Sequence, residues 1–178
     1  LPEQVLKESV QVLANSYSYP EICCGRVIFN GQCYTTENFQ ESKWKQSTHT
    51  DLKRYPKELV LEIYYLEHRE NLDEGPFLKE ERHLLNTIAR ELAVYLDRKK
   101  AEEETHQHAK KFKSVFNSVQ DAVFIHDMEG HMLEVNQEAC RRLGYPREEL
   151  LSMTPLDFDA PEFARKVPTV LKKIKQNG

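Results

Sequence analysis

The sequence predicts an α+β protein, in which an antiparallel sheet with flanking helices is followed by a long helix and then by a smaller unit of two strands and short helices. Three observations support this prediction. Asn30-Gly31 separates two β-rich runs, apolar residues take up helical spacing from Phe77 onward, and a second turn at residues 127–130 divides two further short runs. The change of period at residue 77, from two to about 3.6, indicates the change from sheet to helix.

The length and composition of the chain limit the kinds of protein that it can be. The 178 residues are enough for two small domains, and 39% hydrophobic with 30% charged residues is typical of a soluble globular protein. No apolar run approaches the roughly 20 residues that span a bilayer. The net charge of −4 and the pI of about 6.0 provide no positive field for nucleic acid. We therefore expect a cytoplasmic protein that makes no membrane contact and binds no nucleic acid.

The N-terminal part of the chain predicts one sheet with a helix across it. Residues 3–14 carry apolar side chains at helical spacing behind Pro2, and Leu1-Pro2 resembles neither a signal peptide nor a natural first residue, so we expect a piece of a longer protein. Runs 22–29 and 32–36 form a hairpin, because Asn-Gly accepts the positive φ angles of a type I′ turn. A third strand is expected around Trp44 and a fourth at residues 59–66.

A long helix is predicted from Phe77 to about Phe116, because residues 97–113 contain neither glycine nor proline. At about 1.5 Å per residue it would be about 60 Å long, and a solvated helix of that length usually needs a partner. Its a and d positions are apolar at each end of the polar stretch, at Leu85, Ile88, Leu92, Ala109, Phe112, Phe116 and Val119. This pattern predicts a parallel homodimer through the helix. The alternative interpretation is a flexible charged linker.

The C-terminal third predicts a second hairpin followed by short helices. Asp127 and Gly130 suit the first and fourth corners of a type I turn between strands at residues 121–126 and 131–135. Asn136 is expected to cap a helix that ends at Gly144, and further helical stretches follow at residues 146–151 and 161–174.

The run DAVFIHDMEGHMLEVNQEACRRLGYPREELL, residues 121–151, resembles the start of a PAS domain. The resemblance implies a sensor or dimerisation module whose five-stranded sheet wraps around a small pocket. It covers two of the five strands, so we expect a truncated PAS unit. The side chains that it would place around the pocket are Phe124, Val135, Cys140 and Leu143.

Upstream, LVLEIYYLE followed by FLKEERHLLNTIARELAVYLDRK resembles the end of a GAF domain. The runs YPEICCGRVIFNGQCYTTENF and DEGPFLKEER resemble a compact domain that precedes PAS repeats in bacterial and archaeal sensor histidine kinases. The long central stretch in which larger GAF domains bind cyclic nucleotides or tetrapyrroles is absent. The expected division is a GAF-like domain at residues 1–96, a coiled-coil linker helix at 97–117 and the PAS part at 118–178.

Catalytic and metal-binding motifs are absent from the sequence. His106 and His108 point about 200° apart on a helix, and His126 and Asp127 lie on opposite faces of a strand. Cys23, Cys24 and Cys33, placed in a hairpin, are interpreted as small apolar residues. We expect no catalytic residue, no metal site, no enzymatic activity and no cofactor in this fragment.

These observations predict a sensory and regulatory fragment of a multidomain signal-transduction protein, a sensor histidine kinase of a two-component system, which relays signals through a dimeric helix. One alternative is the input module of a cyclic-di-nucleotide synthase or hydrolase. An alternative of another class is a small cysteine-dependent hydrolase that uses Cys24 with a histidine. The expected partner is a second copy of the chain, and an unidentified small-molecule ligand is left open.

Overall fold

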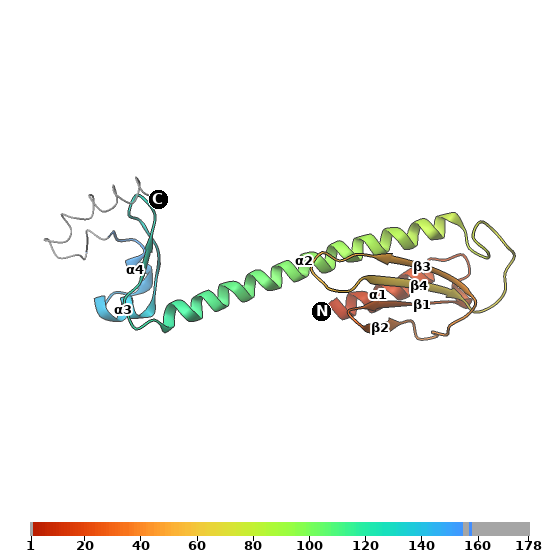
Figure 1. Ribbon diagram of the computed structural model, residues 1–178, viewed down its shortest axis with the longest axis horizontal. Coiled ribbons are helices and arrows are strands. Elements are labelled where there is room, and N and C mark those ends of the chain that lie inside the picture. The colour runs from red at the N-terminus through yellow and green to blue at the C-terminus, as the bar shows by residue number, and fades with distance from the viewer. Residues whose placement is uncertain (1, 155–156, 158–178) are drawn as a thin grey trace. The chain divides into compact units, whose positions relative to one another are not determined.

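The computed structural model describes residues 2–154 and 157, and the chain divides into two compact units, Leu1–Thr105 and His106–Gly178. The described residues form helices and antiparallel strands, which confirms the predicted α+β class with its long helix (Figure 1). The division into residues 1–96, 97–117 and 118–178 stays a prediction.

The first unit is built on a four-stranded antiparallel sheet in the order β2-β1-β4-β3. Its elements are α1 (Pro2–Asn15), a 3₁₀ turn η1 (Pro20–Ile22), β1 (Cys23–Phe29), β2 (Gln32–Thr35), β3 (Trp44–Thr50), β4 (Leu59–Tyr65) and most of α2 (Lys79–Ser118). The first hairpin is as predicted, because Asn30 and Gly31 have φ angles of 50° and 83°. Positive φ at both central residues is what a type I′ turn requires.

The core of the first unit lies between one face of the sheet and the helices α1 and α2. Val27 of β1 pairs with Leu61 of β4, and Cys23 pairs with Tyr65, and all four residues are at most 2% exposed. Alternate residues of both strands therefore face the helices, as a period of two requires. The apolar stripe predicted on α1 is part of this core, at Leu6, Val10 and Leu13.

Gly25 lets α1 lie close to the sheet. It pairs with Ile63 of β4, and a Cβ atom at Gly25 would lie 2.5 Å from Ile63 Cδ1, 2.9 Å from Glu62 O and 3.0 Å from Val10 Cγ2. Because β4 supplies both shorter contacts, a side chain at this position would push the two central strands or α1 apart. The sequence analysis did not single out this glycine.

Helix α2 begins at Lys79, two residues after the predicted start, and continues to Ser118. Phe77 forms an isolated antiparallel bridge with Glu74 and is 2% exposed, so it belongs to the core and not to the helix. Among residues 2–154 and 157, no helix combines the length and the apolar character needed to cross a bilayer.

The predicted dimer seam is wrong at its N-terminal end. Leu85 is 0% exposed and Leu92 is 6% exposed, and both pack in the core of the first unit, with Ile88 partly buried against it. These side chains are therefore covered by their own chain. A stripe that faces a sheet and an a/d seam that faces a second helix have almost the same spacing, so periodicity alone could not distinguish them.

The second unit contains β5 (Phe124–His126), β6 (Met132–Val135), α3 (Gln137–Leu143) and α4 (Arg147–Leu150). The second hairpin is as predicted: β5 and β6 are antiparallel, and the Gly130 N–H donates to Asp127 O at 3.2 Å. Helix α3 ends at Gly144, whose φ of 77° makes it a left-handed C-cap. The helical stretch predicted at residues 161–174 lies outside the described residues.

Candidate functional site

Asn136 connects the end of α2 to the hairpin and to α3 in the second unit. Its side-chain Oδ1 accepts hydrogen bonds from Val123 N at 3.0 Å and from Ala139 N at 2.9 Å. Its Nδ2 donates to Phe116 O at 3.2 Å and to Asp121 O at 2.9 Å. The residue is 0% exposed, and both hydrogens and both lone pairs of the amide are used. The cap on α3 was predicted from the sequence, whereas the two bonds from Nδ2 were not.

The candidate pocket residues lie together in the small core of the second unit. Val135 is 3% exposed and packs with Met132, Ala139 and Leu150. The other three candidates are partly buried against this cluster, at Phe124, Cys140 and Leu143. The four predicted residues therefore form one apolar cluster, and their role as a ligand pocket stays a prediction.

A cleft of about 470 Å³ lies beside this cluster in the second unit. Val135 and Cys140 form part of one wall, and Phe112 and Phe116 of α2 form part of another. The two phenylalanine rings stack with centroids 5.3 Å apart. An apolar wall of this kind suits an apolar side chain or ligand, and its other lining residues include Lys113 and Arg147.

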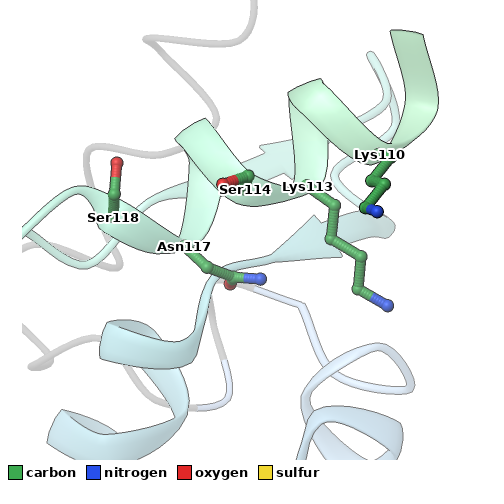
Figure 2. A pocket seen from close by; sticks show the side chains of 5 residues that line it. All are labelled: Lys110, Lys113, Ser114, Asn117 and Ser118. Atoms are coloured by element: carbon green, nitrogen blue, oxygen red, sulfur yellow. The ribbon is translucent and has the colours of Figure 1, made fainter. Parts of the chain in front are cut away.

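A second hollow, of about 460 Å³, borders the last turns of α2 (Figure 2). Its lining residues are Lys110, Lys113, Ser114, Asn117 and Ser118. Figure 2 shows that the two lysine side chains extend away from the Ser118 hydroxyl, so the polar groups do not converge on one point. Asn117 is also occupied, because its Oδ1 accepts a hydrogen bond from Gln137 N at 2.9 Å. This surface lacks the convergent donors of a built anion site.

Glu81 joins three segments at the start of α2 in the first unit. It is 5% exposed, and its carboxylate accepts hydrogen bonds from the Tyr65 hydroxyl, Ser18 N and Leu78 N, each at 2.8 Å. Burial, followed by the hydrogen bond to Glu81, raises the pKa of the Tyr65 hydroxyl above its ordinary value. Sequence analysis missed Glu81, because a capping box needs serine or threonine three residues before the glutamate and Leu78 occupies that position.

The opposite face of the sheet carries a compact network around Glu62. Its carboxylate accepts hydrogen bonds from Arg26 Nε, from Lys45 Nζ at 3.1 Å and from the Tyr64 hydroxyl at 2.8 Å. Burial opposes ionisation of Glu62, but these three hydrogen bonds outweigh it, so its pKa lies below the ordinary value. The Arg26 guanidinium also lies 5.5 Å from the centroid of the Phe39 ring. Glu62 and Glu81, which are both buried, are thus occupied by structural hydrogen bonds.

The cysteines have the environment of apolar residues. Cys23 is 2% exposed and Cys24 is 0% exposed, and burial raises the pKa of both thiols. The Cys24 thiol donates to Gln40 O at 3.2 Å. Cys33 is exposed and Cys140 is partly buried, and all four are free thiols. Since the thiolate is the reactive form, this arrangement disfavours Cys23 and Cys24 as nucleophiles.

Two of the histidines, His131 and His49, each pair with one carboxylate. His131 Nδ1 lies 2.9 Å from Asp127 Oδ2 and His49 Nδ1 lies 3.3 Å from Glu58 Oε2. The hydrogen bond with His131 lowers the pKa of Asp127. Within the part of the chain that the structure describes, no three His, Cys, Asp or Glu side chains are grouped so that they could hold a metal ion.

Residues 110–174 match the family model described as "PAS domain". This match supports a PAS-type sensor domain in the second unit and agrees with the resemblance noted at residues 121–151.

A protein described as "Methyl sulfide methyltransferase-associated sensor", from Methanosarcina acetivorans, is 27% identical over 101 residues. The aligned region is 56% of this chain and 10% of that protein, so the chain spans about a tenth of its relative. The crystal structure of the E. coli DhaR(N)-DhaL complex is similar with a TM-score of 0.48 and 13% sequence identity, over 92% of this chain and 74% of that chain. A TM-score at this level does not establish a shared fold.

Proposed function

We propose that this chain is a sensory and regulatory segment of a multidomain signal-transduction protein, and that it relays a signal along α2. Two findings support a sensory signalling role: residues 110–174 match a PAS domain, and the relative that aligns over 101 residues is described as a sensor. In this proposal the first unit is GAF-like and the output domain of the parent protein is a histidine kinase of a two-component system. The input module of a cyclic-di-nucleotide synthase or hydrolase is the second candidate.

The continuity of α2 is the observation that carries the relay. Its N-terminal half supplies Leu85, Leu92 and Leu96 to the core of the first unit. Its C-terminal end is held in the second unit by the hydrogen bond from Asn136 Nδ2 to Phe116 O. Since one unbroken helix contributes to both units, a rotation or shift imposed at one end acts on the contacts at the other.

The proposed partner is a second copy of this chain, paired through the C-terminal part of α2. Phe112 is 51% exposed and Val115 is 58% exposed, whereas Leu85 and Leu92 are buried in their own unit. Pairing at residues 109–119 would cover the exposed side chains without disturbing either core. We also propose a cytoplasmic location, no nucleic-acid partner and no cofactor or catalytic activity in this segment. The cysteine-hydrolase alternative is disfavoured by the full burial of Cys24.

Insertion into α2 tests the relay in the full-length protein that carries this segment. Two alanines added after Thr105 rotate everything beyond by about 200°, whereas seven rotate it by a net of only about 20°. We expect two alanines to change the output strongly and seven to leave it nearly normal. If both insertions leave the output unchanged, α2 is a passive linker and the proposal fails. Labelling of the full-length protein by ATP would favour the kinase, and a cyclic dinucleotide product would favour the second candidate.

A further inference from the structure

The loop between β3 and β4, residues 51–58, lies against α2 just where the apolar stripe of the helix ends. Leu96 is 0% exposed and is the last residue of α2 in the core of the first unit. The next residue, Asp97, accepts two hydrogen bonds from this loop, from Lys53 N to Oδ2 and from Arg54 N to Oδ1, each at 3.0 Å. One carboxylate is thus held by two consecutive backbone amides.

A second contact extends the same arrangement along the helix. Arg54 Nη1 lies 2.7 Å from Glu104 Oε2. Asp97 and Glu104 are seven residues apart, so they lie on one face of α2, about two turns from each other. Up to Leu96, α2 makes apolar contacts with the core of the first unit. Beyond Leu96, the loop makes polar contacts with the helix.

The base of this loop is fixed to the sheet. Leu52 is 8% exposed and belongs to the core of the first unit. The Tyr55 ring packs edge-on against Phe29 at the end of β1, with centroids 4.9 Å apart. A displacement of β3 against β4 would therefore move the loop backbone that holds Asp97.

These contacts are of the kind that can open and close. The side chains of Arg54 and Glu104 are 46% and 38% exposed, and an ion pair that exposed contributes little to stability. The carboxylate bonds at Asp97 are stronger, but their amide donors lie in an exposed loop. By contrast, Glu81 is 5% exposed and its carboxylate accepts three hydrogen bonds, so its release would leave buried donors without a partner.

We propose that residues 51–58 form a clamp on residues 97–104 of α2, and that the clamp passes a change in the sheet to the helix. When the clamp is closed, two turns of α2 beyond the core are held against this loop. When it opens, these turns are free to rotate with the rest of the helix. The inference rests on the proposed relay, and it names the contact at which the first unit controls α2.

The test is hydrogen exchange in this chain with Asp97→Ala and Arg54→Ala. Alanine has the higher helix propensity, so faster exchange in Asp97→Ala cannot come from a weaker intrinsic helix. Arg98→Ala is the matched control, because Arg98 is the next residue and its ion pair, with Glu102, stays within the helix. Lys53→Ala is the control for Arg54→Ala, because it changes the adjacent side chain and leaves the backbone donor in place.

We expect amides of residues 97–105 to exchange about tenfold faster in Asp97→Ala and a few fold faster in Arg54→Ala. Both controls should stay within about twofold of wild type, and amides of β4 should be unchanged in all four variants. Exchange in Asp97→Ala no faster than in Arg98→Ala would overturn the clamp.

The regulatory part is tested in the full-length protein with the same pair of variants. Asp97→Ala should shift the signalling output, and Arg98→Ala should not. Faster exchange without any shift in output would reduce the clamp to a structural contact and overturn the proposal. The alanine insertions after Thr105 distinguish a failure of the clamp from a failure of the relay. If only the clamp were wrong, the insertions would still change the output.

Discussion

Asn136 gives the sharpest prediction for the second unit, because two substitutions separate its two roles. Asn136→Ala removes the cap on α3 and the bonds to Phe116 O and Asp121 O. Asn136→Asp keeps the cap, since aspartate and asparagine are equivalent N-cap residues. It replaces the Nδ2 donor by an oxygen, which would lie 3.2 Å from Phe116 O and 2.9 Å from Asp121 O if nothing moved.

The magnitude follows from the four hydrogen bonds of this buried side chain. A buried donor or acceptor left without a partner costs about 1–3 kcal/mol. Water can reach some of the freed groups, because Asp121 is exposed, so we expect Asn136→Ala to destabilise the second unit by about 3–5 kcal/mol. Asn136→Asp should cost about 2–4 kcal/mol, all of it from the contacts with α2 and Asp121.

Native-state hydrogen exchange measures this loss. Amides of residues 123–139 should exchange at least about a hundredfold faster in Asn136→Ala, while amides of β4 serve as an unchanged internal reference. Asn117→Ala, which removes one exposed hydrogen bond to Gln137 N, should have a much smaller effect. If Asn136→Asp exchanges like wild type, the Nδ2 bonds do not hold α2 to the second unit and the reasoning is refuted.

Three further predictions concern single sites. Gly25→Ala should destabilise the first unit by about 3 kcal/mol, because its Cβ would overlap β4. Gly75→Ala is the control and should cost about 1 kcal/mol, because nothing lies within 4 Å of its Cβ. Trp44 fluorescence during urea unfolding would report both losses of stability, and equal losses would contradict the packing argument. Leu92→Asp should lower the urea midpoint of the first unit through a buried charge, and an unchanged midpoint would show that Leu92 is not in the core. Hydrogen bonds from Arg141 and Arg142 lower the pKa of Glu138 from 4.5 to about 2, so the stability that Glu138 adds is fully present above about pH 4.5 and is lost as the pH falls toward 2. Glu138→Gln should flatten the pH dependence of the hydrogen-exchange protection of α3 over that range. An unflattened curve would assign the pH dependence to other groups.

The parts of the fold that depend on neighbouring residues were predictable from the sequence. The hairpin at Asn30-Gly31 and the cap at Asn136 each need only a few adjacent residues. The same is true of the left-handed end of α3 at Gly144. Such signals need no knowledge of distant partners, because turn and cap geometry is decided locally.

The parts that depend on distant partners were not predictable. Asp97 meets the amide of Lys53 from 44 positions away, and nothing in a polar helical stretch marks that carboxylate as an acceptor for a loop. Gly25 is one glycine in a strand, and its need for close approach depends on where Ile63 and Glu62 of β4 and Val10 of α1 lie. The four candidate pocket residues came from the resemblance to a PAS domain; they lie in or against one apolar cluster, and their role as a ligand pocket stays a prediction.

The relay requires that two copies of α2 pair beyond the first unit, and light scattering tests this directly. At tens of micromolar we expect a mass twice the 20.9 kDa of one chain. Phe112→Asp should return the mass to that of one chain, because it places a charge in the proposed seam. Val94→Asp is the matched control, since Val94 is also exposed on α2 but lies outside residues 109–119, and it should remain a dimer. A single-chain mass for the unmodified protein, or a dimer that Phe112→Asp leaves intact, would contradict the account.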